Sequence, residues 1–222
     1  MKKTFLLFLL CSFFFINIKG QQKYNKDKFV NLGLKVGFNS AIPTINLQTE
    51  YGSLSSETTN SVGYIGEVFM RLNLNRVYFQ PELAYCLTKE HISIQTEDHS
   101  NYATFNINVN SLDASAIWGY NTVKEDRYGL SLFSGVKIKY AYEIDLKSSK
   151  SAKHTTDNEA FYNFYITTGL GVNVSNLFFD FRYDIALKKN DIDMTGLRSA
   201  SYGKINLNRK ANILSFSIGV LF

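Results

Sequence analysis

The sequence predicts an all-β fold: an eight-stranded antiparallel transmembrane β-barrel with meander topology, short periplasmic turns and long extracellular loops. Three observations predict it. Segments that alternate apolar and polar residues recur from residue 30 to the end, which is the period of a strand with two unlike faces. The connections between these segments alternate between long and short, as in outer-membrane barrels. The 222 residues include 18 Phe and 14 Tyr but only two Pro, which is typical of strands.

The chain divides into a leader and one domain. Residues 1–20 are predicted to be a secretory signal peptide, because two lysines precede an apolar run over residues 4–18 and Gly20 offers a small residue for cleavage. Residues 21–29 form a short lead-in, and residues 30–222 form the barrel. No stretch after residue 20 is long and apolar enough for a membrane helix.

The leader also carries most of the positive charge. The chain has 24 Lys and Arg against 19 Asp and Glu, and three of the lysines lie in the leader, which leaves the mature chain at +2. This balance gives no reason to expect nucleic acid as a partner. Only Cys86 remains after the leader, so no internal disulfide is expected and Cys86 is predicted to be a small buried side chain.

Each predicted strand places its side chains alternately on two faces. In the last strand, every second residue from Leu214 to Phe222 is large and apolar, whereas Ser215, Ser217 and Gly219 point the other way. This strand is expected to pair with the first, which removes the free edges of the sheet. The fourth strand changes phase, which predicts a β-bulge near Asn110. The strands are predicted over residues 30–39, 62–72, 76–88, 105–121, 127–143, 160–174, 177–187 and 205–222.

The connections are of two kinds. Residues 73–75, 123–126 and 175–176 are predicted to be short turns. The other connections are polar and are predicted to be long outer loops, over residues 40–61, 89–102, 145–159 and 188–202.

The charged residues indicate which face meets lipid. A soluble barrel of the lipocalin type has the same period with its apolar face inside. Here the strand charges share a face with Gly, Ser and Asn, and none shares the aromatic face. An eight-strand lumen is narrow and is filled by side chains. We therefore expect the apolar face to meet outer-membrane lipid and the charges to form an interior structural network, made of Lys35, Glu67, Arg71, Glu82, Asp113, Lys137, Lys139, Asp180 and Arg182, with Glu143 and Asp184 on the same face.

The interior network has two interpretations. It can be a salt-bridge plug, because buried charges must be paired, or a gated polar path for small solutes. Catalysis by a pair of interior carboxylates is less favoured than either interpretation, because a substrate would have to enter a filled lumen.

The three histidines fall in predicted outer loops. His91 and His99, with Glu97 and Asp98, match no standard metal-site spacing, and His154 stands apart from them. No metal, cofactor or catalytic site is predicted, so an enzyme is not expected.

Several motifs resemble the PorT-like bacterial outer-membrane β-barrel family, which carries an outer membrane protein beta-barrel domain. The third strand contains Gln80, Pro81, Glu82, Leu83 and Tyr85, which is similar to the family's Q-P-E-L-x-Y motif. Residues 168–172, 180–183 and 217–222 are similar to its G-x-G, R-Y and G-x-x-F strands, whereas residues 112–115 depart from its L-E-I-P pattern.

The resemblance implies an eight-stranded outer-membrane barrel in a Gram-negative cell. The named member of the family is linked to protein secretion by the type IX route, but the matched motifs are structural and do not carry that role to this chain.

The expected function is structural or interactive: a barrel with a filled lumen that displays outer loops or docks periplasmic partners. The alternatives are a narrow channel for small solutes or a component of type IX secretion. The expected partners are outer-membrane lipid, the barrel-assembly machinery through the C-terminal strand that ends on Phe222, and proteins at the loops or turns.

Overall fold

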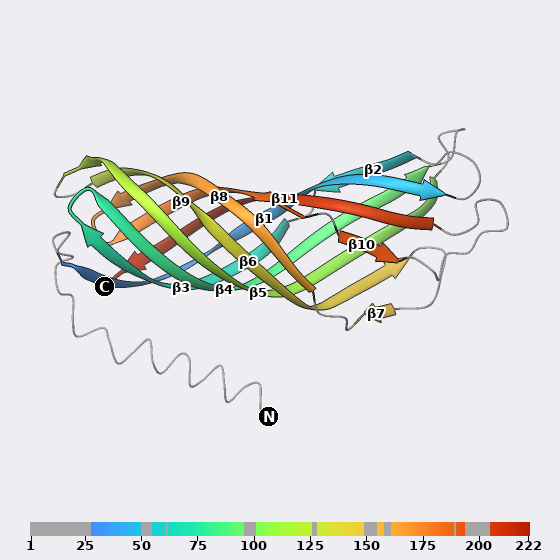
Figure 1. Cartoon of the computed structure of the whole chain (residues 1–222), viewed down its shortest axis with the longest axis horizontal. Helices are drawn as coiled ribbons and strands as arrows, with labels where there is room; N and C mark the ends of the chain where they lie inside the picture. Colours follow the sequence, from blue (N-terminus) through green and yellow to red (C-terminus); the bar gives the residue numbers. More distant parts are fainter. Residues whose placement is uncertain are drawn as a thin grey trace, which may run out of the picture.

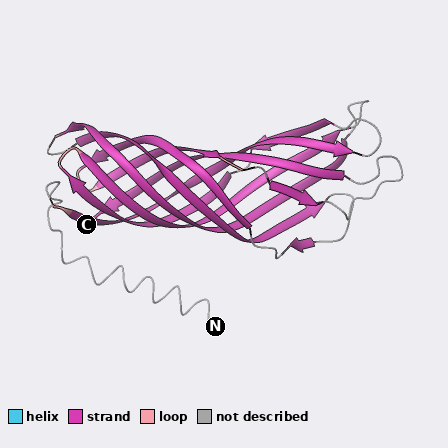
Figure 2. Cartoon of the chain, in the orientation of Figure 1, coloured by secondary structure: helices cyan, strands magenta, loops and turns pink. Residues whose placement is uncertain are grey.

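The computed structural model describes residues 28–49, 55–60, 62–95, 101–125, 128–148, 155–157, 161–188, 190–193 and 205–222. All regular elements in these ranges are strands (Figure 2). No helix among them is long and apolar enough to cross a membrane. The predicted signal peptide lies outside the described residues. The strands are β1 (Val30–Thr49), β2 (Ser55–Asn60), β3 (Val62–Leu74), β4 (Val77–Gln95), β5 (Asn101–Lys124), β6 (Tyr128–Ser148), β7 (Thr155–Asp157), β8 (Phe161–Val174), β9 (Leu177–Ala186), β10 (Asn190–Asp193) and β11 (Ile205–Leu221).

The eight long strands form one closed antiparallel barrel (Figure 1). They pair in chain order, from β1 through β3, β4, β5, β6, β8 and β9 to β11. The barrel closes because β1 also pairs with β11, in a register that runs from Gly33 opposite Leu221 to Thr49 opposite Ile205. Closure removes the two free edge strands that an open sheet of this order would have. The predicted strand number, meander order and closing pair are confirmed.

Three short turns lie at one end of the barrel, at the left of Figure 1, and we call this the turn end. They join β3 to β4, β5 to β6, and β8 to β9. Asn75 and Ser175 adopt left-handed conformations, with φ of 60° and 55°, which tight connections of this kind require. The chain also ends here, where the Phe222 amide donates to the Leu32 carbonyl over 2.8 Å.

The strands extend further towards the opposite end, the loop end, than the sequence predicts. β1 continues to Thr49 and β4 to Gln95, and β2, β7 and β10 lie within predicted loops. β2 has the sequence Ser-Ser-Glu-Thr-Thr-Asn, and it pairs with β4. The prediction missed these segments because it required an apolar face, whereas strand pairing depends on the backbone N–H and C=O groups.

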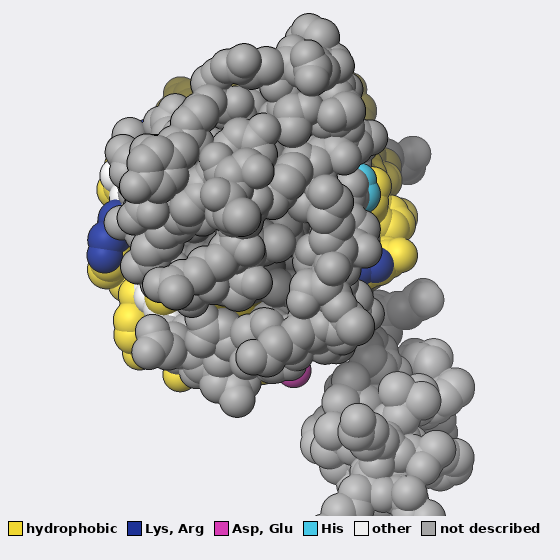
Figure 3. Space-filling model, turned by 90° about the vertical axis from the view of Figure 1, so that its right-hand side faces the viewer, with side chains coloured by type: hydrophobic (Ala, Val, Ile, Leu, Met, Phe, Trp, Pro, Cys, Tyr) yellow, Lys and Arg dark blue, Asp and Glu magenta, His cyan; other side chains and the backbone are white. Residues whose placement is uncertain are grey.

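Outward and inward side chains differ sharply in chemistry. Val36 and Leu83 each keep 63% of their surface exposed and Trp118 keeps 53%, whereas Lys35 keeps 2% and Asp184 none. Seen from the loop end, the described side chains around the circumference are mostly hydrophobic (Figure 3). The structure therefore has the inside-out arrangement predicted from the charges.

A β-bulge occurs where the sequence predicts one, but the extra residue lies in the neighbouring strand. Asn110 pairs with Glu143 and Ser111 pairs with Ala141, which leaves Tyr142 of β6 without a partner. The alternation of β6 therefore shifts by one residue. Glu143 lies on the outer face, where its Oε2 accepts from Asn110 Nδ2 over 2.8 Å, and this corrects its predicted place on the inner face.

Candidate functional site

The centre of the lumen holds a cluster of five charged side chains from four strands, which we call the central cluster. Lys35 of β1 places its Nζ 2.9 Å from Glu67 Oε2, 2.8 Å from Glu82 Oε1 and 3.1 Å from Asp180 Oδ2. Arg182 donates through both terminal nitrogens to the Glu82 carboxylate, over 2.9 and 3.0 Å. These side chains are at most 5% exposed. Moving each charge out of water is costly, and the ion pairs offset this cost only when every member of the cluster is present.

A second cluster lies nearer the loop end. Lys137 pairs with Asp184 and lies 3.5 Å from Asp113. Thr167 and Ser111 donate to the two carboxylates, over 2.6 and 2.8 Å respectively. Lys139 Nζ donates to Thr88 Oγ1 over 3.1 Å. The sequence predicts that Asp184 lies on the charged face. It does not predict the ion pair with Lys137, because alternation shows the face of a side chain and not its partner.

Arg71 stands apart from both clusters. Its guanidinium stacks on the Tyr78 ring, with Cζ 4.4 Å from the ring centroid, and Nε donates to Gln80 Oε1. Gln80 in turn donates to Glu82 Oε1 over 2.6 Å. The structure therefore connects Arg71 to the carboxylates only through an amide.

A layer of aromatic rings fills the lumen between Arg71 and the central cluster, and sequence reasoning missed it. Phe69 and Phe178 meet edge to face with centroids 5.1 Å apart. Each ring of the layer lies opposite a glycine on the adjacent strand, and a Cβ on Gly33 would lie 2.2 Å from Phe69 Cζ. The sequence contains a signal for this aromatic layer, because large residues paired with glycines on the inner face predict rings that cross the lumen. The remaining pairs are Tyr78 with Gly119, Phe133 with Gly169, and Phe178 with Gly219.

The loop-end side of the lumen holds apolar side chains together with the buried Thr88 and Glu90, which pair with Val109 and Ile107 in the β4–β5 ladder. Ile107 and Val109 of β5 and Ile144 of β6 are at most 6% exposed, and Tyr165 places its ring 5.0 Å from Lys137 Nζ. The bulge at Tyr142 directs Ile144 inward, so these residues cover the second cluster. The lumen is thus filled by an aromatic layer, then by the two charged clusters, and then by a layer of mixed polarity at the loop end.

The Q-P-E-L-x-Y segment contributes directly to this interior. Gln80 and Glu82 point inward, whereas Leu83 and Tyr85 point outward, with 63% and 51% of their surfaces exposed. Pro81 lies where the β3–β4 ladder is interrupted, between the pairs Phe69–Glu82 and Leu72–Phe79. A residue without an N–H is tolerated at such a gap.

The remaining candidate residues are Cys86 and the three histidines. Cys86 is buried as predicted, and its Sγ lies 3.1 Å from Asn39 Nδ2. His91 lies in β4 and not in a loop, and its Nδ1 is 2.5 Å from Asn106 Oδ1. His99 and His154 lie outside the described residues. Within the described part of the chain, no group of His, Cys, Asp and Glu side chains could hold a metal ion.

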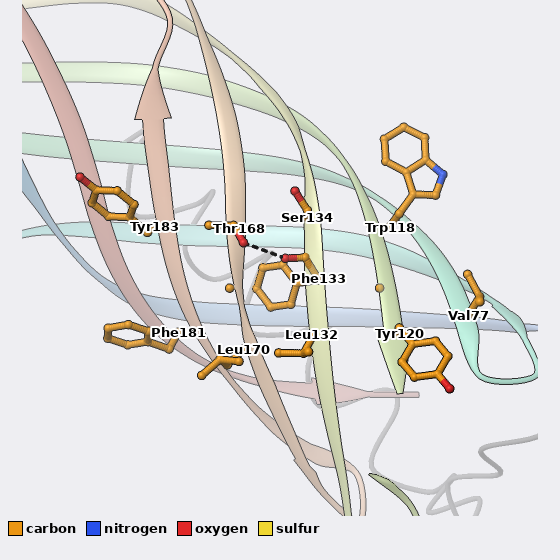
Figure 4. Close-up of a pocket in the computed structure, with 12 residues that line it drawn as sticks. Val77, Trp118, Tyr120, Leu132, Phe133, Ser134, Thr168, Leu170, Phe181 and Tyr183 are labelled. Carbon is orange, nitrogen blue, oxygen red and sulfur yellow. Dashed lines mark hydrogen bonds between the residues drawn. The ribbon is translucent and has the colours of Figure 1, made fainter. Parts of the chain in front are cut away.

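A hollow lies on the outer surface of the barrel (Figure 4). It is a depression of about 690 Å³ across β5, β6, β8 and β9, bordered by Trp118 and Tyr183. The hydroxyls of Ser134 and Thr168 donate to backbone carbonyls over 3.0 and 3.3 Å. The depression therefore presents a largely apolar surface, suited to contact with lipid chains.

Comparisons with known proteins agree with this architecture. The profile of a family described as outer membrane protein beta-barrel domain matches residues 20–191. No curated protein matches the sequence. The crystal structure of the outer membrane protein OprG from Pseudomonas aeruginosa is similar at a TM-score of 0.58 and 11% identity, covering 88% of this chain and 97% of that chain. At that identity the likeness shows the fold alone.

Two further structures are less similar. Ail, the attachment invasion locus protein of Yersinia pestis, matches with a TM-score of 0.43 and 11% identity, covering 88% of this chain and 100% of that chain. Neisserial surface protein A matches with a TM-score of 0.39 and 13% identity, covering 88% of this chain and 98% of that chain.

Proposed function

This chain belongs to the outer membrane protein beta-barrel domain family, and from that premise we propose that it is a plugged barrel with a structural or interaction role. It displays its loop end outside the cell and docks periplasmic partners at its turn end. The orientation follows the rule that short turns of outer-membrane barrels are periplasmic. The proposal includes export by the signal peptide of residues 1–20 and no enzymatic activity.

The filled lumen is the observation that supports this role. Each layer blocks the path in a different way: rings paired with glycines, then two ion-paired clusters, then Ile107, Val109 and Ile144. A permeating ion would have to separate pairs such as Lys35 and Glu82, which costs the desolvation of both charges. A barrel of this kind acts through its surfaces rather than through its lumen.

Type IX secretion is a narrower version of the same proposal, and it rests on the PorT-like resemblance alone. The residues that carry that resemblance have structural roles in this fold. Gln80 and Glu82 belong to the interior network, and Pro81 lies at the ladder gap. We therefore place the general interaction role before the secretion role.

Single-channel recording tests the plugged lumen. The purified barrel, refolded and shown to shift on an unheated gel, is added to a planar phospholipid bilayer in parallel with an open porin as the incorporation control. We expect no discrete current steps from the protein under conditions in which the porin conducts. Reproducible steps of uniform size would refute the plug and favour the narrow channel.

A further inference from the structure

The depression on the outer surface has tall walls and a low floor. One row of paired residues crosses it, and the row consists of Trp118 of β5, Ser134 of β6, Thr168 of β8 and Tyr183 of β9. Two small side chains therefore lie between two aromatic ones (Figure 4). The next row towards the turn end repeats this order with Tyr120, Leu132, Leu170 and Phe181. The depression thus follows β6 and β8, between aromatic walls on β5 and β9.

Both walls are held in place by contacts outside the depression. The Trp118 ring packs against the Phe79 ring of β4, with centroids 5.0 Å apart. On the opposite side, the Tyr183 hydroxyl accepts a hydrogen bond from Asn212 Nδ2 of β11 over 3.0 Å. Neither Phe79 nor Asn212 lines the depression. An occupant therefore meets side chains that are already ordered, which lowers the entropic cost of binding.

The chemistry of the floor favours an aliphatic occupant. None of the described side chains that line the depression is charged. The hydroxyls of Ser134 and Thr168 donate to the carbonyls of Thr167 and Phe133, so their protons are not offered to a polar ligand. An apolar chain can cover this floor without leaving a hydrogen-bond donor unsatisfied.

The shape of the depression favours lipid over a second copy of the barrel. In a two-fold symmetric contact the same patch faces itself, and two depressions placed face to face would leave a void without packing contacts. The surface faces the membrane, so lipid is the partner at hand. The lining includes Val77, the first residue of β4 after the β3–β4 turn. The depression therefore reaches the turn end of the lipid-facing surface.

We propose that the depression holds one acyl chain of a phospholipid from the leaflet at the turn end, and that this chain exchanges more slowly than the surrounding lipid. The chain lies along β6 and β8, with Trp118 and Tyr183 at its sides. Towards the loop end it continues over Val136 and Ile166, which are paired and point outward. That this leaflet is the periplasmic one rests on the proposed orientation of the barrel.

Trp118 reports on the site, because it forms one wall and is the only tryptophan in the chain. The full barrel, refolded in lipid-free detergent micelles, is titrated with phosphatidylethanolamine whose acyl chains carry bromine, at a constant micelle concentration. We expect quenching of Trp118 that saturates with one lipid per barrel and is reversed by phosphatidylethanolamine without bromine. Quenching that rises in proportion to the lipid content and never saturates would show solvation alone and would overturn the proposal.

Matched variants locate the bound chain. Ser134→Leu and Thr168→Leu fill the floor and should each abolish the saturable quenching. Ala114→Leu makes a similar change on the outer face of β5, outside the depression, and should preserve it. All three place an apolar side chain against lipid, so the barrel should still fold, which a shift on an unheated gel verifies. Saturable quenching that survives both floor variants, or that is also lost in Ala114→Leu, would contradict the site.

Light scattering on the same samples separates a lipid from a second copy. A dimer that either floor variant converts to a monomer would assign the depression to self-association and overturn the lipid site. The plugged lumen is tested independently by single-channel recording, so a barrel that fails the lipid titration and yet shows no current steps would lose this site and keep its proposed function.

Discussion

Lys35→Met should be among the most damaging conservative changes in this barrel. Methionine keeps most of the volume of the lysine stem, so the substitution removes the charge without opening a large cavity. The central cluster holds two cations and three carboxylates, and all three carboxylates lie within 3.1 Å of Lys35 Nζ. Without Lys35, only Arg182 faces them. Breaking a buried ion pair costs about 3–5 kcal/mol, and we expect a loss in that range.

Urea unfolding in phospholipid vesicles, followed by Trp118 fluorescence, measures this loss. Lys89→Met is the control: Lys89 lies on the outer side, with Nζ 5.6 Å from the Tyr64 ring centroid, and its loss should cost no more than about 1 kcal/mol. Adding Glu67→Gln to Lys35→Met removes one unpaired carboxylate and should recover about 1–2 kcal/mol. The reasoning is refuted if Lys35→Met costs less than about 1 kcal/mol, or if the double variant is no more stable than the single one.

Three other predictions concern packing, assembly and partners. Gly33→Ala should cost about 1–3 kcal/mol, because its Cβ would meet the facing aromatic ring, whereas Gly66→Ala should be tolerated because a Cβ there meets nothing within 4 Å; equal urea midpoints would contradict this. Phe222→Ser should lower the amount of folded barrel in the outer membrane without changing refolding in detergent, if the C-terminal strand is the signal for the assembly machinery; an unchanged amount would remove that role. A photoreactive residue at Arg76 should cross-link a protein in intact cells and one at Leu83 should not; indistinguishable patterns would count against docking at the turn end.

The sequence predicted the architecture well because the barrel depends on a period-two pattern. Val36 and Leu83 mark the lipid face and Lys35 and Glu82 mark the lumen without any knowledge of contacts. The closing pair of β1 and β11 followed from the need to remove sheet edges.

The details that failed depend on interactions between strands. The bulge was predicted in β5 from its change of phase, but the register places the extra residue, Tyr142, in β6. Glu143 consequently turns outward, which no pattern within one strand can reveal. Arg71 shares the charged face but stacks on Tyr78 instead of joining the central cluster. Both outcomes are set by the relative register of neighbouring strands, and alternation alone does not determine register.

The fluorescence of Trp118 tests most directly whether the aromatic face meets lipid and the charged face fills the lumen. This is the only tryptophan in the chain, and it points outward with 53% of its surface exposed. In vesicles whose acyl chains carry bromine, we predict strong quenching of Trp118, with little quenching by acrylamide added to the water. Quenching by acrylamide without quenching by the brominated chains would place Trp118 away from lipid and contradict the inside-out arrangement.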